Sequence, residues 1–596
     1  MFFHSFLIVA GLLAAETPDS LSAAVVVADK GMIVSRTDTV HISNQTDITE
    51  ALSNFPSLVM GDMGGSAGLK SVNLRGLGST HTAVYVDGVR VSNVQSGQTD
   101  LGMLDIGNCS GIVVDYAQNS LSFNTSKPRF GTSKVTGNVK LRGGSFSTWE
   151  PAARLDFKLS DKISLSATSS ASLSKGDFLY GNDSRRANND ISQIRAAIDV
   201  WGLMDKGSWH SKAYFNGSQR GTPGSIDWPS SDRQKDRNIF IQGVMQNRFT
   251  PRYTLNASAK LAYDDLSYLS EWGDSRYQTA GFQLNSSHIV SIASWLEISI
   301  AADIHRDILK ASDYDAGRTS LISALTSSFR LSGFKADVSI EYSGTFDKGS
   351  GGINTISPSA DLRYAITDGL DITAFGRRAC RVPTFNELYY PGFGNPNLKC
   401  EDAWLSSLGL QWRTHVSNWT ANAGADFNFN TIKDKIVSAP STEDPALWFP
   451  YNIGKALIYG ADLKAGAAFR KENWSCSLSA AYTWQDTKDK TPDSASYDEQ
   501  IPFVARHSLA TSLNCTFKGL SLNLTWNLRS GRRDSASPMP DYNTLDISVG
   551  KDFPFRRGSS LGLKFLARNI TDTRYELSSG YPMPGRALYG SIEYNF

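Results

Sequence analysis

Residues that could bind a metal ion or act as nucleophiles are scattered along this chain. It contains 8 His and 5 Cys, and no two His residues lie at metal-ligand spacing. No local Ser-His-Asp or paired-carboxylate signature appears, although a triad assembled only in space would leave no local pattern. We therefore predict no metal site, no cofactor and no enzymatic activity. His81 stands alone and is predicted to be a structural hydrogen-bonding residue.

A second kind of chemistry is available from aromatic side chains in polar, glycine-rich segments. Rings of this kind can hold a bulky, mostly uncharged ligand by stacking and shape. They can equally form a girdle at a membrane surface, and the sequence leaves both roles open. The candidates are Trp228, Tyr389, Tyr390, Phe393, Trp448, Phe449, Tyr497, Tyr542 and Tyr581. The elements that would position them are considered next.

Charge and the N-terminus limit the class of protein. The 596 residues include 59 basic and 58 acidic side chains, a net charge of +1, so no nucleic-acid partner is indicated. The apolar run "FLIVAGLLAA" predicts an export signal over residues 1–15, cut near Ala14 and Ala15, although no Lys or Arg precedes it. A buried N-terminal strand is the alternative. No later stretch is long and apolar enough to predict a membrane-spanning helix.

Most of the chain shows strict two-residue alternation of apolar and polar side chains. In "WTANAGADFNFN" (419–430) one side is Trp, Ala and Phe, and the other is mostly Asn, Asp and Thr. The segments 521–530, 561–569 and 588–596 follow the same pattern. A soluble sandwich also alternates, but strands this long with a polar second face cannot pack into a dry core. They predict a closed barrel with lipid outside and water inside.

The connections between these strands fall into two classes. Short joints such as 366–369 and 517–520 alternate with long stretches such as 380–400 and 486–504, as in outer-membrane barrels. We predict an all-β transmembrane barrel of about 22 antiparallel strands over residues 138–596. A barrel this wide would leak unless something filled it.

The residues before the barrel are the candidate filling. They lack the long alternation and contain compact segments: "ITEALSNFPSLV" predicts a short helix, and "AVYVDGVRV" predicts two short strands around Asp87 and Gly88. We predict a small α/β domain over 36–137 inside the lumen. A passive porin, which needs an open lumen, is disfavoured.

Together these segments resemble the TonB-dependent outer-membrane receptors over nearly the whole chain. The plug-like part is "ITEALSNFPSLVM", followed by "SVNLRGLGSTHTAVYVDGVRV". The barrel part comprises "RVPTFNELYYPGFGNPNLKCE", "YNIGKALIYGADL", "IPFVARHSL", "LARNITDTRYE" and "GYPMPGRALYGSIEYNF", in the family's order. The resemblance implies an integral protein of the bacterial outer membrane. The family's Gly-Gly pair before the last plug strand is reduced here to "VTGNVKL", which predicts a loosened end of the plug.

The resemblance also implies a mechanism and partners. Such receptors admit a bound solute when the inner-membrane TonB complex pulls on a short segment captured by strand addition. Residues 16–35 contain the only β-rich apolar run in that region, so the predicted TonB box is Ala24, Val25, Val26, Val27 and Ala28. An ordinary first plug strand is the alternative. The terminal Phe596 resembles the signal read by the barrel-assembly machinery.

The resemblance narrows the ligand less sharply. The barrel motifs are most similar to cobalamin-type receptors, so cobalamin or a related corrinoid is the first expected ligand. A ferric siderophore is the second. A carbohydrate or peptide ligand and a surface lipoprotein partner stay open. Haem is disfavoured, because 381–398 lacks the His of haem receptors. The predicted plug-apex contacts are Gly64, Gly65, Ser66, Ala67, Asn93, Val94, Gln95 and Ser96. The predicted loop contacts are Trp228, Tyr389, Tyr390, Phe393, Trp448 and Tyr497.

Five Cys in an exported chain raise the question of disulfides. Cys380 and Cys400 bracket a long loop and are the first predicted pair. Cys476 and Cys515 fall on one face of neighbouring strands and are the second. Cys109 is predicted to be a buried apolar residue of the plug.

Overall fold

The computed structural model describes most of the chain. The predicted export signal, the predicted TonB box Ala24–Ala28 and Ser66 lie outside the described residues. The residues that the structure describes are 37–41, 48–52, 55–65, 67–91, 93–181, 183–348, 352–441, 447–534, 537–555 and 558–596. No helix within these ranges is long and apolar enough to cross a membrane.

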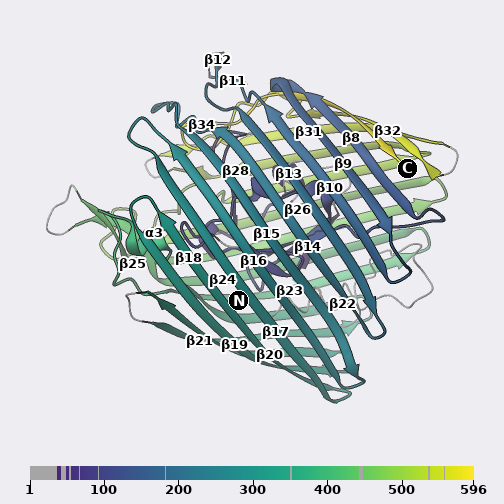
Figure 1. The fold of residues 1–596 in the computed structure, drawn as a ribbon, viewed down its shortest axis with the longest axis horizontal. Coiled ribbons are helices and arrows are strands. Elements are labelled where there is room, and N and C mark those ends of the chain that lie inside the picture. The colour runs from purple at the N-terminus through teal and green to yellow at the C-terminus, as the bar shows by residue number, and fades with distance from the viewer. Residues whose placement is uncertain are drawn as a thin grey trace.

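Twenty-two antiparallel strands close into a barrel, which confirms the predicted fold class (Figure 1). The strands, each beside the next around the barrel, are β10 (Ile163–Ser174), β13 (Ile191–Met204), β14 (Gly207–Gly221), β15 (Arg233–Thr250), β16 (Tyr253–Leu269), β17 (Ser275–Ala293), β18 (Leu296–Ala311), β19 (Asp315–Leu331), β20 (Phe334–Asp347), β21 (Ile353–Thr367), β22 (Leu370–Arg381), β23 (Glu401–Val416), β24 (Trp419–Pro440), β25 (Trp448–Lys471), β26 (Trp474–Asp489), β27 (His507–Phe517), β28 (Leu520–Ser530), β31 (Tyr542–Pro554), β32 (Ser560–Arg568), β35 (Ala587–Asn595), β8 (Val135–Gly144) and β9 (Thr148–Lys158).

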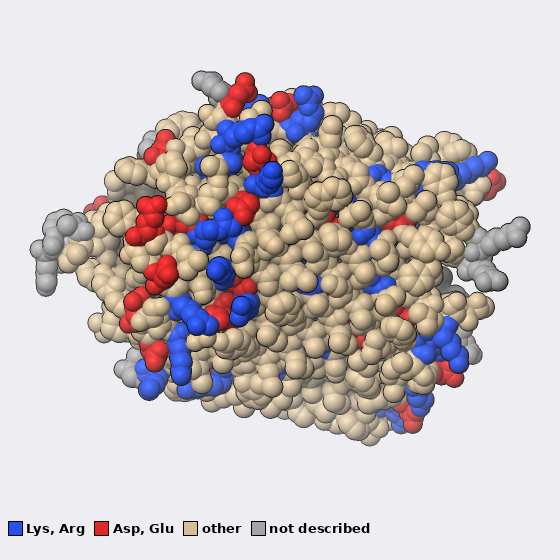
Figure 2. Space-filling view, turned by 45° about the horizontal axis from the view of Figure 1, so that its top comes forward, with Lys and Arg blue, Asp and Glu red and all other residues tan. Residues whose placement is uncertain are grey.

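The predicted two faces of the strands are real. In β24, Phe427 and Phe429 are 60% and 54% exposed, whereas Asn428 and Asn430 between and beside them are 6% and 2% exposed. The apolar side chains therefore point outward and the amides point into the filled lumen. Figure 2 shows the consequence: the middle of the wall carries almost no charge, and Lys, Arg, Asp and Glu gather toward the rims. A charge on the lipid-facing wall near its middle would cost about 2–4 kcal/mol.

The last strand closes the barrel against the first. β35 pairs with β32 and β8, and the Phe596 N–H donates to the Gly137 carbonyl at 3.0 Å. Ile592, Tyr594 and Phe596 are all more than 40% exposed, so the apolar face of the C-terminal strand lies on the outer wall as the alternation predicts.

The N-terminal plug packs inside the barrel. Its mixed sheet has the order β1-β6-β7-β4-β5, with β2 and β3 as a separate hairpin. Its core residues, such as Leu52, Leu74 and Ile112, join one apolar cluster with Tyr214 and Phe240 of the barrel wall. The plug elements are β1 (Thr37–His41), α2 (Ile48–Leu52), β2 (Leu58–Asp62), β3 (Lys70–Leu74), η2 (Ser79–His81), β4 (Ala83–Val86), β5 (Val89–Val91), η3 (Leu101–Met103), η4 (Ile106–Asn108), β6 (Cys109–Asp115) and β7 (Ser120–Thr125).

Two local expectations need correction. The predicted helix over "ITEALSNFPSLV" ends at Leu52, and its last residues begin strand β2, because Pro56 cannot continue a helix. The segment "VTGNVKL" is not the end of the plug but the start of β8, a barrel strand that begins at Val135, slightly before residue 138. The prediction of a loosened plug end on that segment is therefore wrong. The hairpin around Asp87 and Gly88 is confirmed by β4 and β5.

Short turns close one end of the barrel, and long connections gather at the other, which we call the long-loop rim. Short turns join β21 to β22, β25 to β26 and β27 to β28, as predicted. The long-loop rim includes 382–400, 490–506, 531–541 and 569–586. Its small elements are η5 (Ser145–Ser147), β11 (Leu179–Tyr180), β12 (Ser184–Arg185), α3 (Phe385–Tyr389), β29 (Arg532–Arg533), β30 (Pro538–Met539), β33 (Glu576–Ser578) and β34 (Tyr581–Pro582).

Candidate ligand site at the plug apices

Two plug loops rise toward the long-loop rim, and both contain predicted ligand contacts. The first follows β2. Here Asp62 Oδ1 accepts hydrogen bonds from the N–H groups of Gly64 (3.1 Å) and Gly65 (2.8 Å). Both glycines have positive φ, and a Cβ on Gly65 would lie 3.2 Å from Pro584 of the barrel loops. This apex therefore requires glycine both for its backbone and for its close approach to the wall.

The second apex is a side-chain-stabilised turn at Asn93. The Asn93 Oδ1 accepts from the N–H groups of Gln95 (3.0 Å) and Ser96 (3.1 Å), and its carbonyl accepts from Gly97 N–H at 2.8 Å. Val94 is half-buried against the barrel loops, whereas Ser96 is exposed. The turn thus presents polar groups at the long-loop rim.

A barrel loop with the helix α3 lies directly on the second apex. The Phe385 N–H donates to the Val94 carbonyl and the Asn386 N–H donates to the Gln95 carbonyl, both at 3.0 Å. The Thr384 hydroxyl accepts from Glu387 N–H and the Glu387 carboxylate accepts from Thr384 N–H, so a capping box starts the helix. The apex and the loop form one hydrogen-bonded unit.

The aromatic residues of this loop pack inward. Phe385 is fully buried against the barrel, and the Tyr389 hydroxyl donates to Asp347 Oδ2 at 3.0 Å. Tyr390 contacts the ring of Tyr314 edge-on, with the centroids 6.2 Å apart, and Phe393 is half-buried. Burial raises the pKa of Tyr314, which keeps its hydroxyl a neutral donor to Asn386.

A cavity of about 290 Å³ separates the second apex from strands β14 to β18. Its chemistry is mixed. Amides from both the plug and the wall line it, together with aromatic rings and charged groups. The lining includes Asn93, Gln95, Gln98, Gln234, Asn238, Tyr277, Arg220, Asp236 and Lys260.

Two of the cations in this cavity, Arg220 and Lys260, are held by protein groups. Arg220 lies 2.7 Å from Asp100 and 3.7 Å from Asp236. Lys260 donates to the Arg90 carbonyl at 3.0 Å and lies 4.6 Å above the Phe240 ring. With these two cations engaged, the cavity offers mainly amide donors and acceptors and ring faces, which suits a large polar ligand of low charge.

The structure brings together some of the predicted site residues and not others. Asn93, Gln95 and Ser96 line the cavity, and Val94 joins the apex to α3. Trp228, Trp448 and Tyr497 are 82%, 52% and 55% exposed and lie outside its lining. Sequence reasoning missed the wall residues Gln234, Asn238 and Tyr277. The inward register of each strand was the available signal, but it marks every lumen residue alike and cannot single out those near an apex.

Side-chain groups at several points of the described chain anchor the plug to the barrel, among them the Arg220–Asp100 pair and three groups around Arg75, His81 and Asp87. In the first, Arg75 of the plug donates from Nε and Nη2 to Asp462 Oδ2 of β25 at 3.1 and 2.9 Å. The Thr483 hydroxyl donates to the other Asp462 oxygen at 2.6 Å. The Arg75 guanidinium also lies 4.5 Å from the centre of the Tyr116 ring.

The second anchor runs from the plug to α3. His81 Nε2 pairs with Glu401 Oε2 of β23, as its predicted structural role requires. Arg381 donates to Glu401 Oε1 at 2.6 Å and to both Glu387 oxygens at 3.0 Å. The capping box of α3 is thereby connected to a buried plug side chain.

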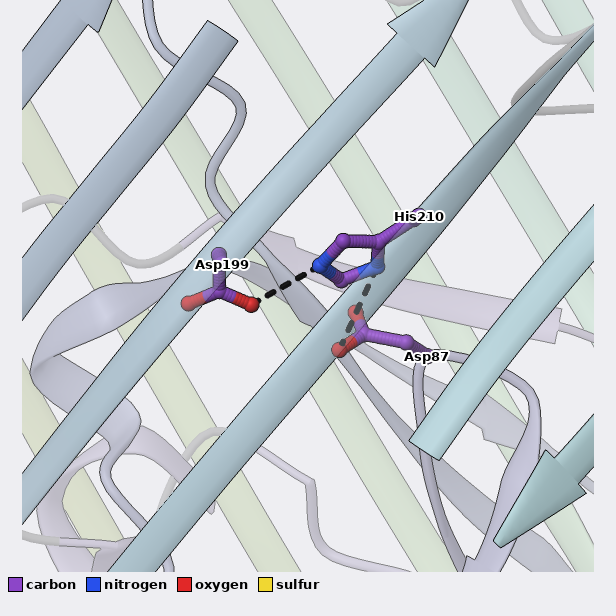
Figure 3. Close-up of side chains that lie close together, drawn as sticks. All are labelled: Asp87, Asp199 and His210. Carbon is purple, nitrogen blue, oxygen red and sulfur yellow. Dashed lines mark hydrogen bonds and ion pairs between the residues drawn. The ribbon is translucent and has the colours of Figure 1, made fainter. Parts of the chain in front are cut away.

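The third anchor groups Asp87 of the plug with His210 and Asp199 of the wall (Figure 3). His210 Nε2 lies 2.8 Å from Asp199 Oδ1, and Nδ1 lies 3.9 Å from Asp87 Oδ2. The Lys212 ammonium lies 2.9 Å from the same Asp199 oxygen and 3.9 Å from Asp87. Lys212 supplies the positive charge that these carboxylates need, so the group serves as an ionic anchor.

The cysteines divide into bonded and unbonded pairs. Cys476 and Cys515 are register partners on β26 and β27 and form a disulfide with a Cα–Cα distance of 4.1 Å, which confirms the second predicted pair. Cys380 and Cys400 are both half-buried and are not bonded to each other in the structure. Cys109 is half-buried in the plug, where burial raises the pKa of its thiol.

Comparison with known proteins identifies this architecture. A family model described as "TonB dependent receptor-like, beta-barrel" matches residues 97–570, and one described as "TonB-dependent Receptor Plug Domain" matches residues 30–128. The "Vitamin B12 transporter BtuB" of Vibrio vulnificus is 25% identical over 93% of this chain and 90% of the relative. The protein of the same name from Photobacterium profundum is 21% identical over 92% and 90%.

The fold is also shared with solved structures. The FrpB iron transporter from Neisseria meningitidis (F3-3 variant) superposes with a TM-score of 0.76 at 13% identity, covering 94% of this chain and 99% of that one. The first family model spans well over half of the chain, and the plug model covers the domain that fills the lumen. The chain therefore belongs to the family of TonB-dependent receptors, the integral β-barrel transporters of the bacterial outer membrane.

Proposed function

We propose that this receptor takes up cobalamin or a related corrinoid. The observation that carries the proposal is the amide-lined cavity beside the Asn93 apex, in which Arg220 is already paired with Asp100. A corrinoid is a large ring with a periphery of carboxamides. Amide side chains such as Gln95, Gln98 and Asn238 can donate to and accept from such groups at the same time. Two relatives that are named vitamin B12 transporters support the same ligand.

The ligand is larger than the cavity, so we place its bulk above the plug. In this arrangement the ring rests on the two apices around Gly64 and Asn93, and one edge of its periphery enters the cavity. The exposed rim aromatics Trp228, Trp448 and Tyr497 then contact the ligand as it arrives, together with Tyr389, Tyr390 and Phe393 of the α3 loop. A surface lipoprotein could cover the same rim.

Transport requires a pull from the inner membrane. We propose that TonB captures Ala24–Ala28 by strand addition, where main-chain hydrogen bonds supply the affinity. The force then passes to the plug and acts on the anchors at Arg75, His81 and Asp87. Delivery of the receptor to its membrane is proposed to rest on Phe596 as the signal for the barrel-assembly machinery.

Equilibrium binding of cyanocobalamin to the detergent-purified receptor tests the ligand assignment. We expect saturable binding, and we expect Gln95→Ala to weaken it by about 0.5–1.5 kcal/mol, the usual net value of a hydrogen bond. Gln278→Ala is the matched control, because Gln278 is a half-buried residue of β17 outside the cavity lining, and its side chain donates to the Tyr263 hydroxyl. Absence of cyanocobalamin binding to the folded wild-type receptor would contradict the corrinoid proposal.

A ferric siderophore is the second candidate. It is favoured by the fold shared with a structure named as an iron transporter and by Arg90, a further cation in the lining of the cavity. A competition experiment decides between the two ligands. If a ferric siderophore displaces bound cyanocobalamin at micromolar concentration, both ligands share the site. If the siderophore binds and cyanocobalamin does not, the siderophore replaces the corrinoid as the proposed ligand.

A further inference from the structure

A second cavity lies on the opposite side of the plug, beside the Gly64–Gly65 apex. It has a volume of about 170 Å³ and is enclosed by the plug hairpin β2–β3 and by the connections that follow β26, β28 and β32 at the long-loop rim. Two arginines and two tyrosines set its chemistry, and we call it the arginine pocket. They are Arg529, Arg532, Tyr542 and Tyr575.

Arg532 is buried in this pocket without a charged partner. It is 5% exposed, and its Nη1 and Nη2 donate to the carbonyl oxygens of Glu576 (2.6 Å) and Pro540 (2.8 Å). Its Nε has no hydrogen-bond partner among the described residues. Its guanidinium carbon lies 4.5 Å from the centre of the Tyr542 ring. Among the described residues, the guanidinium of Arg532 therefore has a free Nε donor and no salt bridge.

Arg529 adds a second guanidinium to the same pocket. Its Nη1 donates only to the backbone carbonyls of Leu528 (3.1 Å) and Leu509 (3.4 Å). It lies near enough to Arg532 for the two positive charges to repel each other. Within the described part of the chain, neither arginine has a carboxylate at salt-bridge distance.

The acidic groups nearby are engaged elsewhere. Asp541 accepts from the Ser530 hydroxyl (2.8 Å) and Gly531 N–H (2.9 Å), and Glu576 accepts from Gly580 N–H at 2.9 Å. The third arginine of the lining, Arg568, lies 4.0 Å from Asp546. Within the described residues, Arg529 and Arg532 therefore have no carboxylate in direct contact, although Asp541 and Glu576 attract Arg532 from a longer distance.

An oxygen anion would satisfy both arginines. A buried charge without a partner is unfavourable, and a guanidinium binds phosphate or carboxylate oxygens through charge-assisted hydrogen bonds. Beside the arginines, the rings of Tyr542 and Tyr575 stack with centroids 4.4 Å apart and an angle of 22° between planes. The stacked pair gives the pocket a flat apolar wall next to its positive charge.

We propose that the arginine pocket binds an anionic oxygen group of the transported ligand, a phosphate ester or a carboxylate, with an adjacent flat part of the ligand against Tyr542. This deepens the proposed function and rests on it, because the anion is taken to belong to the solute that sits on the plug apices. For a corrinoid the group would be the phosphate diester of its nucleotide arm.

Binding to the full-length receptor in detergent tests this assignment with three probes. Cyanocobalamin carries a phosphate diester, dicyanocobinamide has the same ring without one, and ferric citrate offers carboxylates. We expect Arg532→Met to weaken cyanocobalamin binding by about tenfold or more and to leave dicyanocobinamide unchanged. Arg533→Met is the matched control, since Arg533 lies outside the pocket and pairs with Glu499 at 2.7 Å. Heat-modifiable migration on a gel verifies that each variant is folded.

A crystal soak in selenate tests the site independently of the ligand. We expect an anomalous peak between Arg529 and Arg532 in the wild-type receptor and none in Arg532→Met. An empty pocket in the wild type, or equal cyanocobalamin affinity of wild type and Arg532→Met, would overturn the proposal. If the wild type binds neither corrinoid, the proposed function fails and the selenate result alone decides the anion site. If Arg532→Met weakens only ferric citrate binding, the pocket binds a carboxylate rather than the phosphate diester of a corrinoid, and the assignment to the nucleotide arm is overturned.

Discussion

Arg75 illustrates how single residues hold the plug while leaving it removable. Its bond to Asp462 joins positions 387 residues apart, and the aspartate is 1% exposed. Arg75 lies within the segment "SVNLRGLGSTHTAVYVDGVRV", whose resemblance to the family's plug is visible in the sequence. The partner of Arg75 is not visible there, because every inward-facing strand residue is polar and the register between plug and wall leaves no mark in a single sequence.

Arg75→Met is expected to loosen the plug. The substitution leaves Asp462 buried without its cation, which costs about 3–5 kcal/mol. Urea unfolding of the purified receptor, followed by hydrogen exchange of plug amides, should show the plug opening at lower denaturant concentration while the barrel is unchanged. Arg75→Lys keeps the charge but loses the two-donor geometry, so its plug should open at a denaturant concentration between those of the wild type and Arg75→Met. Unaltered plug exchange in Arg75→Met would show that this anchor contributes nothing.

Phe596 carries a prediction about assembly rather than stability. Its side chain is 42% exposed on the outer wall, and its main chain closes the barrel onto Gly137. Deleting Phe596 should lower the amount of folded receptor in the outer membrane, whereas Phe596→Tyr, which keeps an aromatic terminus, should not. Quantitative immunoblotting of heat-modifiable receptor in membrane fractions measures this. Equal amounts in all three strains would remove Phe596 from the assembly step.

At the scale of elements, the α3 loop connects the rim to the plug. The sequence "TFNE" at 384–387 has the spacing of a capping box, so the sequence contains a local signal for the start of this helix, although the helix was not predicted. The sequence could not predict that this helix packs on Val94 and Gln95, because the hydrogen bonds that hold it there join main-chain groups. Strand existence and facing were well predicted, since a period of two is a strong signal over long strands.

The same loop carries a prediction about Cys380 and Cys400. Cys380 lies on β22 and Cys400 directly precedes the paired strand β23, where Arg381 and Glu401 are register partners. Oxidation outside the cytoplasm should therefore join the two thiols and close a loop, adding about 3 kcal/mol of stability. Peptide mass spectrometry of receptor from outer membranes should find this bond along with Cys476–Cys515. In Cys380→Ser the α3 loop should become more sensitive to protease under oxidising conditions only. Two free thiols in the native receptor would refute the closed loop.

At the scale of the whole molecule, the number of strands and the filled lumen decide what the protein can do. The alternation and the length of the chain predicted about 22 strands, and the same number closes the barrel. The need for a filling domain followed from the width of such a barrel. The identity of the ligand could not be predicted from the sequence. The chemistry of the pocket depends on which lumen residues contact the plug apices, and those contacts depend on the orientation of the plug inside the barrel.

Transport by this molecule requires the plug to be moved by an external force, since buried ionic anchors and the α3 loop hold it in place. Whole cells in which this receptor is the only route for labelled cyanocobalamin measure that requirement directly. Removing residues 21–29 should leave binding at the cell surface intact and reduce uptake to the level of cells without the receptor. Undiminished uptake after this deletion would contradict an energised mechanism acting through Ala24–Ala28.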